Sequence, residues 1–150
     1  MRIWLSSMAL VGLAAACGSG AKKQREQEER AALIYALARL DPSAPAKQRA
    51  EMIQAVRKID LTDKEMIATR DVCLDAHQGL LDAHLLQAEA RKAFMEAKSD
   101  DEHRTSHAAH AQEALDASSK TLASARTSLD ACQNHTRTLV RGNAASTTER

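Results

Sequence analysis

The chain has 150 residues, enough for one modest domain, and its formal net charge is +1. Positive and negative side chains are mixed along the chain, which excludes both the basic footprint of a nucleic-acid-binding protein and an acidic tail. Aromatic residues make up 2% of the sequence, with two prolines and five glycines. Residues that lose little side-chain freedom in a helix dominate, so the composition predicts an all-α protein.

An apolar run opens the chain. Residues 3–16 are almost wholly apolar, and this run is short for a transmembrane helix but typical of a signal peptide. It ends in Leu-Ala-Ala-Ala-Cys over residues 13–17, and Gly-Ser-Gly follows. These features predict a cleaved signal peptide over residues 1–16 and a polar tether over residues 17–30, which is flexible at Gly-Ser-Gly. Residues 22–30 are all charged or Gln and fit a helix that has no face to bury.

The segment that ends at Cys17 resembles the lipobox of bacterial lipoproteins, in which small residues precede an invariant cysteine. It carries Ala14 where the family prefers leucine, with Leu13 one position earlier. The resemblance implies a covalent lipid anchor on Cys17, with palmitate-type acyl chains that hold the protein at a membrane. Gly18 stands where an aspartate would retain a lipoprotein in the inner membrane, so the resemblance implies the outer membrane and a periplasmic body. An ordinary secretory signal with an incidental cysteine is the alternative.

A helical domain is expected over residues 31–141, followed by a disordered tail over 142–150. The first helix should cover residues 31–40, where leucines recur at helical spacing, before a proline-containing segment breaks it. We expect Ser43 to cap a second helix. The apolar residues of that helix are Met52, Ile53, Val56 and Ile59.

Two long helices are predicted next. The segment from Thr62 to Glu65 matches a capping box and should start a helix over about 62–98. A second such pattern over residues 99–102 should start a helix over about 101–140, which Gly142 ends. The short connection makes these helices antiparallel. The predicted fold is a long helical hairpin with two shorter helices packed on it, forming a bundle of three or four helices.

Both long helices carry heptad repeats, in which one track holds larger residues and the other holds mostly small ones. Small residues let backbones approach closely, and the 3.5-residue period predicts left-handed, coiled-coil-like packing. A second apolar stripe on the third helix is expected to contact the two short helices. Its residues are Ile67, Leu74, Leu81, Leu85 and Ala88.

Cys73 and Cys132 both occupy heptad positions at the seam of the predicted hairpin. A hairpin centred between residues 102 and 103 would set them opposite each other, and thiols in an exported protein oxidise, so we expect a disulfide. A competing interpretation is a zinc site that adds His77 and His135. The antiparallel arrangement disfavours it, because the two histidines would lie on opposite sides of the cysteine pair. An intermolecular disulfide would form if the two helices made one continuous rod.

His103, His107 and His110 fall on one face of the fourth helix, next to three acidic residues. Three imidazoles beside carboxylates form a candidate site for Zn, Ni or Cu. The alternative is three exposed histidines that bind no metal, because this spacing is also common by chance.

The sequence contains no phosphate-binding loop, nucleophile elbow or zinc-protease motif, so we expect no enzyme and no cofactor besides the lipid. The leading hypothesis is a membrane-anchored envelope lipoprotein with a structural or protein-interaction role toward an envelope partner. The alternative is a periplasmic metal-binding or envelope-stress-sensing helical hairpin. In its favour, Leu61 and Thr62 resemble the start of the Leu-Thr-x-x-Gln motif of small envelope-stress proteins, with Glu65 in place of Gln.

Overall fold

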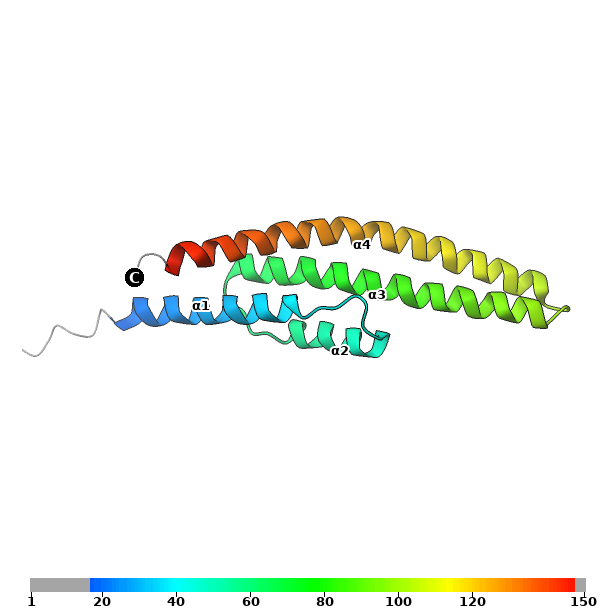
Figure 1. The fold of residues 1–150 in the computed structure, drawn as a ribbon, viewed down its shortest axis with the longest axis horizontal. Coiled ribbons are helices and arrows are strands. Elements are labelled where there is room, and N and C mark those ends of the chain that lie inside the picture. Colours follow the sequence, from blue (N-terminus) through cyan, green and yellow to red (C-terminus); the bar gives the residue numbers. More distant parts are fainter. Residues whose placement is uncertain (1–16, 148–150) are drawn as a thin grey trace, which may run out of the picture.

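The structure is a computed structural model, and it describes residues 17–147. Within this range α3 and α4 lie antiparallel, side by side, and α1 and α2 pack against one half of this pair (Figure 1). The predicted all-α hairpin with two shorter helices is therefore confirmed. The predicted signal peptide over residues 1–16 lies outside the described residues. The helices are α1 (Cys17–Ala38), α2 (Ala46–Arg57), α3 (Lys64–Ser99) and α4 (Arg104–Thr147).

α1 begins at Cys17, well before the start predicted at residue 31. The Gly-Ser-Gly stretch expected to be flexible is therefore helical, and so is the polar segment over residues 22–30, for which a helix without a buried face was considered. Apolar periodicity gave no sign of this, because the segment is held by contacts between polar side chains one turn apart. Such pairs stabilise a helix even where it has no apolar face. They are Gln24–Glu28 at 3.0 Å, Arg25–Glu29 at 2.8 Å and Arg30–Glu26 at 3.3 Å.

Glu29 ties α1 to the loop before α3. Its side chain is only 8% exposed, and its carboxylate accepts hydrogen bonds from the backbone N–H of Thr62 at 2.8 Å and from the Thr62 hydroxyl at 3.0 Å. The guanidinium of Arg25 donates to the same carboxylate at 2.8 Å. These hydrogen bonds, first of all that from the Thr62 backbone, lower the pKa of Glu29, because they stabilise the charged form.

The contact with Glu29 also changes how α3 begins. The capping box predicted from Thr62 to Glu65 is wrong in its cap residue, because Thr62 is bound to α1. Asp63 occupies the N-cap instead, and its carboxylate accepts hydrogen bonds from the backbone N–H groups of Glu65 and Met66, both at 2.9 Å. An aspartate satisfies the free N–H groups of a first turn as well as a threonine does.

Ser43 does not cap α2, contrary to the prediction. Its backbone N–H and hydroxyl both donate to the carboxylate of Asp41, at 2.8 and 2.6 Å, which forms a local turn. Pro45 occupies the N-cap position of α2 without a side-chain hydrogen bond. Ser43 forms this turn instead of capping α2 because Asp and Ser side chains bond readily to groups that are close in sequence.

The α3–α4 turn is shaped by Asp100, whose side chain accepts hydrogen bonds from the backbone N–H groups of Glu102 at 3.1 Å and His103 at 3.2 Å. α3 therefore ends at Ser99, close to the prediction, and α4 starts three residues after the expected residue 101.

α4 does not end at Gly142 but continues to Thr147, so residues 142–147 of the predicted tail are helical. Glycine costs a helix only about 1 kcal/mol relative to alanine, which tertiary contacts readily offset. A Cβ at position 142 would lie 2.8 Å from Nη1 of Arg30 in α1. The missing side chain thus leaves room for α1 to approach the end of α4.

The seam between α3 and α4 is made by the small-residue tracks. The buried α3 track is Thr69, Ala76, Ala83, Ala90 and Ala97, and the buried α4 track is Ala111, Ser118, Ala125, Cys132 and Leu139. The larger tracks, expected to share the seam, do so only at the end near the disulfide, where Met66 and Cys73 are fully buried. Farther along they lie at its edge: Leu80, Leu122 and Leu129 are half-buried, and Phe94 and Leu115 are exposed.

Two contacts show how closely α3 and α4 approach. A Cβ placed on Gly79 would lie 2.9 Å from the Cβ of Ala125, so only glycine fits this backbone separation without adjustment. The hydroxyl of Ser118, which is buried, donates to the backbone carbonyl of Ala83 at 3.0 Å. This bond crosses the seam and gives the serine hydroxyl a partner away from water.

Large buried side chains gather in one half of the molecule. The cluster includes Leu33 and Leu37 of α1, Ile53 and Val56 of α2, and α3 residues only as far as Leu81. In α3 beyond Leu81, the buried residues are all alanines. The predicted stripe on α3 is therefore covered by the short helices at Leu74 and Leu81 and uncovered at its end. We call the half of the hairpin that α1 and α2 cover, which reaches Leu81 in α3, the base, and we call the uncovered remainder the distal hairpin.

Replacing Glu29 with glutamine tests the link between α1 and α3. Because the folded pKa of Glu29 is depressed, its stabilising contribution is present above its ordinary pKa of 4.5 and is lost as the pH falls through the lower folded value. Glu29→Gln should therefore lower the free energy of unfolding at pH 7, and the difference from the unmodified protein should shrink below pH 4.5. Urea unfolding from pH 7 to pH 3 measures this. An unchanged difference over that range would contradict it.

The close approach at Gly79 is tested by a double-mutant cycle with Ala125. In Gly79→Ala alone, overpacking should lower the free energy of unfolding by about 1–3 kcal/mol. This cost cancels or outweighs the gain of about 1 kcal/mol from the higher helix propensity of alanine. Adding Ala125→Gly removes the opposing methyl, so the cycle should give a coupling free energy of about 1 kcal/mol or more. Gly20→Ala is the control, because nothing lies within 4 Å of its added methyl. Additive effects at 79 and 125 would show that the helices are not in tight contact there.

Candidate functional site

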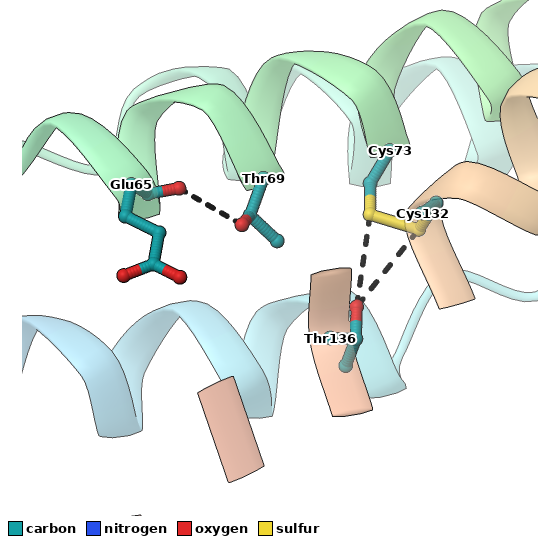
Figure 2. The surroundings of a disulfide bond; sticks show 5 residues. All are labelled: Glu65, Thr69, Cys73, Cys132 and Thr136. Atoms are coloured by element: carbon teal, nitrogen blue, oxygen red, sulfur yellow. Dashed lines mark hydrogen bonds between the residues drawn. A yellow bond between two sulfur atoms is a disulfide. The ribbon is translucent and has the colours of Figure 1, made fainter. Parts of the chain in front are cut away.

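Cys73 of α3 and Cys132 of α4 form a disulfide, and their Cα atoms are 4.7 Å apart. The structure thus places the two cysteines that were predicted to pair at bonding distance within one chain. The hydroxyl of Thr136 lies 3.8 Å from Sγ of Cys73 and 4.0 Å from Sγ of Cys132 (Figure 2). Since a disulfide sulfur carries no proton, the hydroxyl is the donor. With both sulfurs bonded to each other, the competing zinc site with His77 and His135 lacks its two thiolates.

A cavity of 420 Å³ lies beside the disulfide, where α1 crosses the edge of the α3–α4 seam. Its lining is mainly apolar and includes Ile34 and Leu37 of α1 and Leu129 and Cys132 of α4. His77 lines it from α3. Burial lowers the pKa of His77, and the charge of the buried Arg49 lowers it further, so the imidazole is neutral at pH 7.

The three histidines proposed as metal ligands lie at the far end of the hairpin, and each contacts a carboxylate. Nδ1 of His103 is 3.2 Å from Asp100, Nδ1 of His107 is 3.6 Å from Glu96, and Nε2 of His110 is 3.1 Å from Glu89. Hydrogen bonds from the turn, first of all the backbone N–H of His103, lower the pKa of Asp100.

This arrangement spreads the histidines along the helix. Among residues 17–147, no group of three histidine, cysteine, aspartate or glutamate side chains is placed to hold one metal ion. Binding of Zn, Ni or Cu by His103, His107 and His110 stays a prediction.

The distal hairpin exposes large apolar side chains on both helices. Phe94 is 54% exposed and Met95 62% exposed on α3, and Leu115 is 46% exposed on α4. Phe94 and Leu115 line a hollow of 280 Å³ together with Gln87, Arg91 and Ala111. Sequence reasoning missed this hollow. The lengths of the helices could have indicated it: α1 and α2, with 22 and 12 residues, are too short to cover α3 and α4, which have 36 and 44 residues.

Cys17, the predicted lipid attachment site, is the first residue of α1, and its side chain lies outside the described part of the structure. The start of α1 lies at the end of the molecule opposite the α3–α4 turn (Figure 1). The candidate anchor and the exposed apolar residues of the distal hairpin are therefore well separated.

Removing the disulfide should cost much of the stability of the hairpin. The bond links residues 59 positions apart, and on the chain-entropy model a loop of this length contributes about 4 kcal/mol. Cys73→Ala combined with Cys132→Ala should lower the melting temperature by roughly 10 to 20 °C, measured by circular dichroism. Reductant should lower the melting temperature of the unmodified protein by a similar amount and leave that of the double variant unchanged. Equal melting temperatures with and without reductant would show that the bond stabilises nothing.

None of the helices in residues 17–147 combines the length and apolarity needed to cross a membrane. The chain was also compared with known proteins. No family model, no curated protein and no solved structure matches it.

Proposed function

We propose that the chain is a lipid-anchored protein of the bacterial cell envelope that presents its hairpin to a protein partner and carries out no catalysis. One observation carries this proposal: the distal hairpin holds Phe94, Met95 and Leu115 exposed over a seam of alanines. Contiguous exposed apolar side chains on a folded domain are typical of an interaction surface.

The division of the molecule into two halves supports this role. The base is held by the disulfide, by the contact of Glu29 with Thr62 and by the cluster of large buried side chains. The distal hairpin is held by the alanine seam and by the contacts of His107 and His110 with carboxylates of α3, and no further helix of residues 17–147 covers it. A rigid base with an uncovered arm suits presentation better than storage of a ligand.

The length of the hairpin fits an anchored protein that reaches away from a membrane. α3 has 36 residues and at 1.5 Å per residue spans about 54 Å. With a lipid on Cys17, the base lies at the outer-membrane surface and the α3–α4 turn extends into the periplasm. Because the segment after Cys17 is helical, the arm is held by a stiff connection.

Anchoring is tested by expressing the full chain with radiolabelled palmitate in a bacterium that has an outer membrane. We expect label on the protein, a shift to the size that results from cleavage before Cys17, and recovery in the outer-membrane fraction. Cys17→Ser should lose the label, because no thiol accepts the diacylglycerol. Cys73→Ser is the matched control and should keep it. Label that persists in Cys17→Ser, or that is missing from the unmodified chain, would contradict the anchor.

The same membranes test presentation. A photo-reactive residue at position 115, in the distal hollow, should form a light-dependent adduct with another envelope protein. At position 120, exposed on the same helix but outside the hollow, it should form none. Equal labelling from both positions, or none from position 115, would contradict a partner at the distal hairpin.

A further inference from the structure

The cavity beside the disulfide is a gap in the packing of the base. Its volume is 420 Å³, and three helices line it: α1 contributes Ile34 and Leu37, α3 contributes His77, and α4 contributes Leu129 and Cys132. An apolar cavity of about 150 Å³ is already large enough to take up benzene, so this one has room for roughly a dozen carbon atoms. That is the size of one short acyl chain.

The apolar and the polar residues of the lining differ in exposure. Leu37 is buried and Ile34 and Leu129 are half-buried, whereas Gln133 and Arg137 of α4 are exposed. The apolar side chains thus form the floor of the cavity, and the two polar side chains lie at its mouth. Because Gln133 and Arg137 are four residues apart, they are neighbours on one face of α4.

The mouth of the cavity carries a positive charge that no carboxylate compensates. The lining contains no aspartate or glutamate. The guanidinium of Arg137 donates to the neutral side-chain oxygen of Asn134 at 3.1 Å, and it forms no ion pair with a side chain that the structure describes. Asp130, the nearest acidic residue in the described part of α4, is seven residues away, about 10 Å along the helix. Arg137 therefore has donors left for a carboxylate or a phosphate.

The potential at the α3 wall of the cavity is also positive. The charge of Arg49, which is buried in α2, lowers the pKa of His77. Asp41, whose pKa Arg49 also lowers, accepts hydrogen bonds from Ser43 and does not line the cavity. A cavity with positive potential at its wall and at its mouth favours an anionic ligand over a cationic one.

We propose that this cavity binds the acyl chain of a single-chain anionic amphiphile, a fatty acid or a lysophospholipid, and that Arg137 and Gln133 bind its head group. The chain lies between α1 and the α3–α4 pair, and the carboxylate or phosphate accepts hydrogen bonds from the guanidinium and the side-chain amide. The bound chain fills the gap beneath α1 and so becomes part of the packing of the base. This inference goes beyond the proposed function, since presentation by the distal hairpin requires no ligand.

The test uses the full chain with Cys17→Ser, which has no lipid of its own to compete for the cavity. Binding of octanoate and decanoate, below their micellar concentrations, is measured by isothermal titration calorimetry at pH 8. The two additional methylenes of decanoate should tighten binding by up to about tenfold, because each enters an apolar environment. Decanol has the same chain without the charge and should bind roughly tenfold more weakly than decanoate, because it forms no charge-assisted hydrogen bonds with Arg137.

Two variants locate the ligand. Arg137→Gln should remove the preference for decanoate over decanol. Arg126→Gln is the matched control, because it removes one exposed arginine of α4 outside the cavity, and it should keep the preference. Ala38→Phe places a ring at an exposed position of the lining and should weaken decanoate and decanol alike by roughly tenfold. Circular dichroism checks the fold of each variant, and saturating decanoate should raise the melting temperature of the parent chain.

The head group distinguishes the two sources of this chemistry. Decanoyl lysophosphatidylglycerol that binds at least as tightly as decanoate assigns the site to a lysophospholipid, and binding of decanoate alone assigns it to a free fatty acid.

Four outcomes would overturn the proposal: equal binding of decanoate and decanol, an affinity that does not change with chain length, no saturable binding by any probe, or unchanged binding in Ala38→Phe. Because these experiments replace Cys17 and leave the distal hairpin unaltered, their result is independent of the proposed function.

Discussion

The close approach of α3 and α4 is the constraint on which the rest of the structure depends. It is possible only because alanine, serine and glycine occupy the facing positions, with the Cα atoms of Cys73 and Cys132 4.7 Å apart and Gly79 pressed against Ala125. Alanines bury little apolar area, so this seam contributes little hydrophobic free energy per residue. A covalent bond at the base and a layer of larger side chains from α1 and α2 make up for it.

The same approach moves the larger heptad residues out of the seam. Along the distal hairpin the two helices touch along alanines, which leaves no space between them for Phe94 and Leu115. These side chains therefore lie at the edge of the seam, where they line a hollow. At the base α1 covers that edge and Leu33 and Leu37 are buried. Along the distal hairpin nothing in residues 17–147 covers it. The close packing of α3 and α4 thus accounts both for the short distance that the disulfide spans and for the exposed apolar surface on which the proposed function depends.

Electrostatics separates the two flanks of the distal hairpin. On one flank Glu89, Glu96 and Asp100 contact histidines, so their charges are partly compensated. On the other, Arg91 lines the hollow beside Phe94 and Leu115. At the base, the buried carboxylate of Glu29 accepts hydrogen bonds from Thr62 and Arg25. Polar contacts thus help to fix the position of α1 along the α3–α4 pair.

The sequence by itself determined the helical class, the hairpin, its turn and the cysteine pairing, because heptad spacing and a short connection leave few other arrangements. It did not settle that residues 17–30 belong to the first helix, since polar pairs rather than an apolar face hold that segment, nor that Asp63 caps α3, since Thr62 is bonded to a residue 33 positions away. Which heptad track faces the partner helix was likewise open, because large and small tracks both fit the period. Only the tertiary structure decided this, through the backbone separation, and with it the existence of the hollow lined by Phe94 and Leu115.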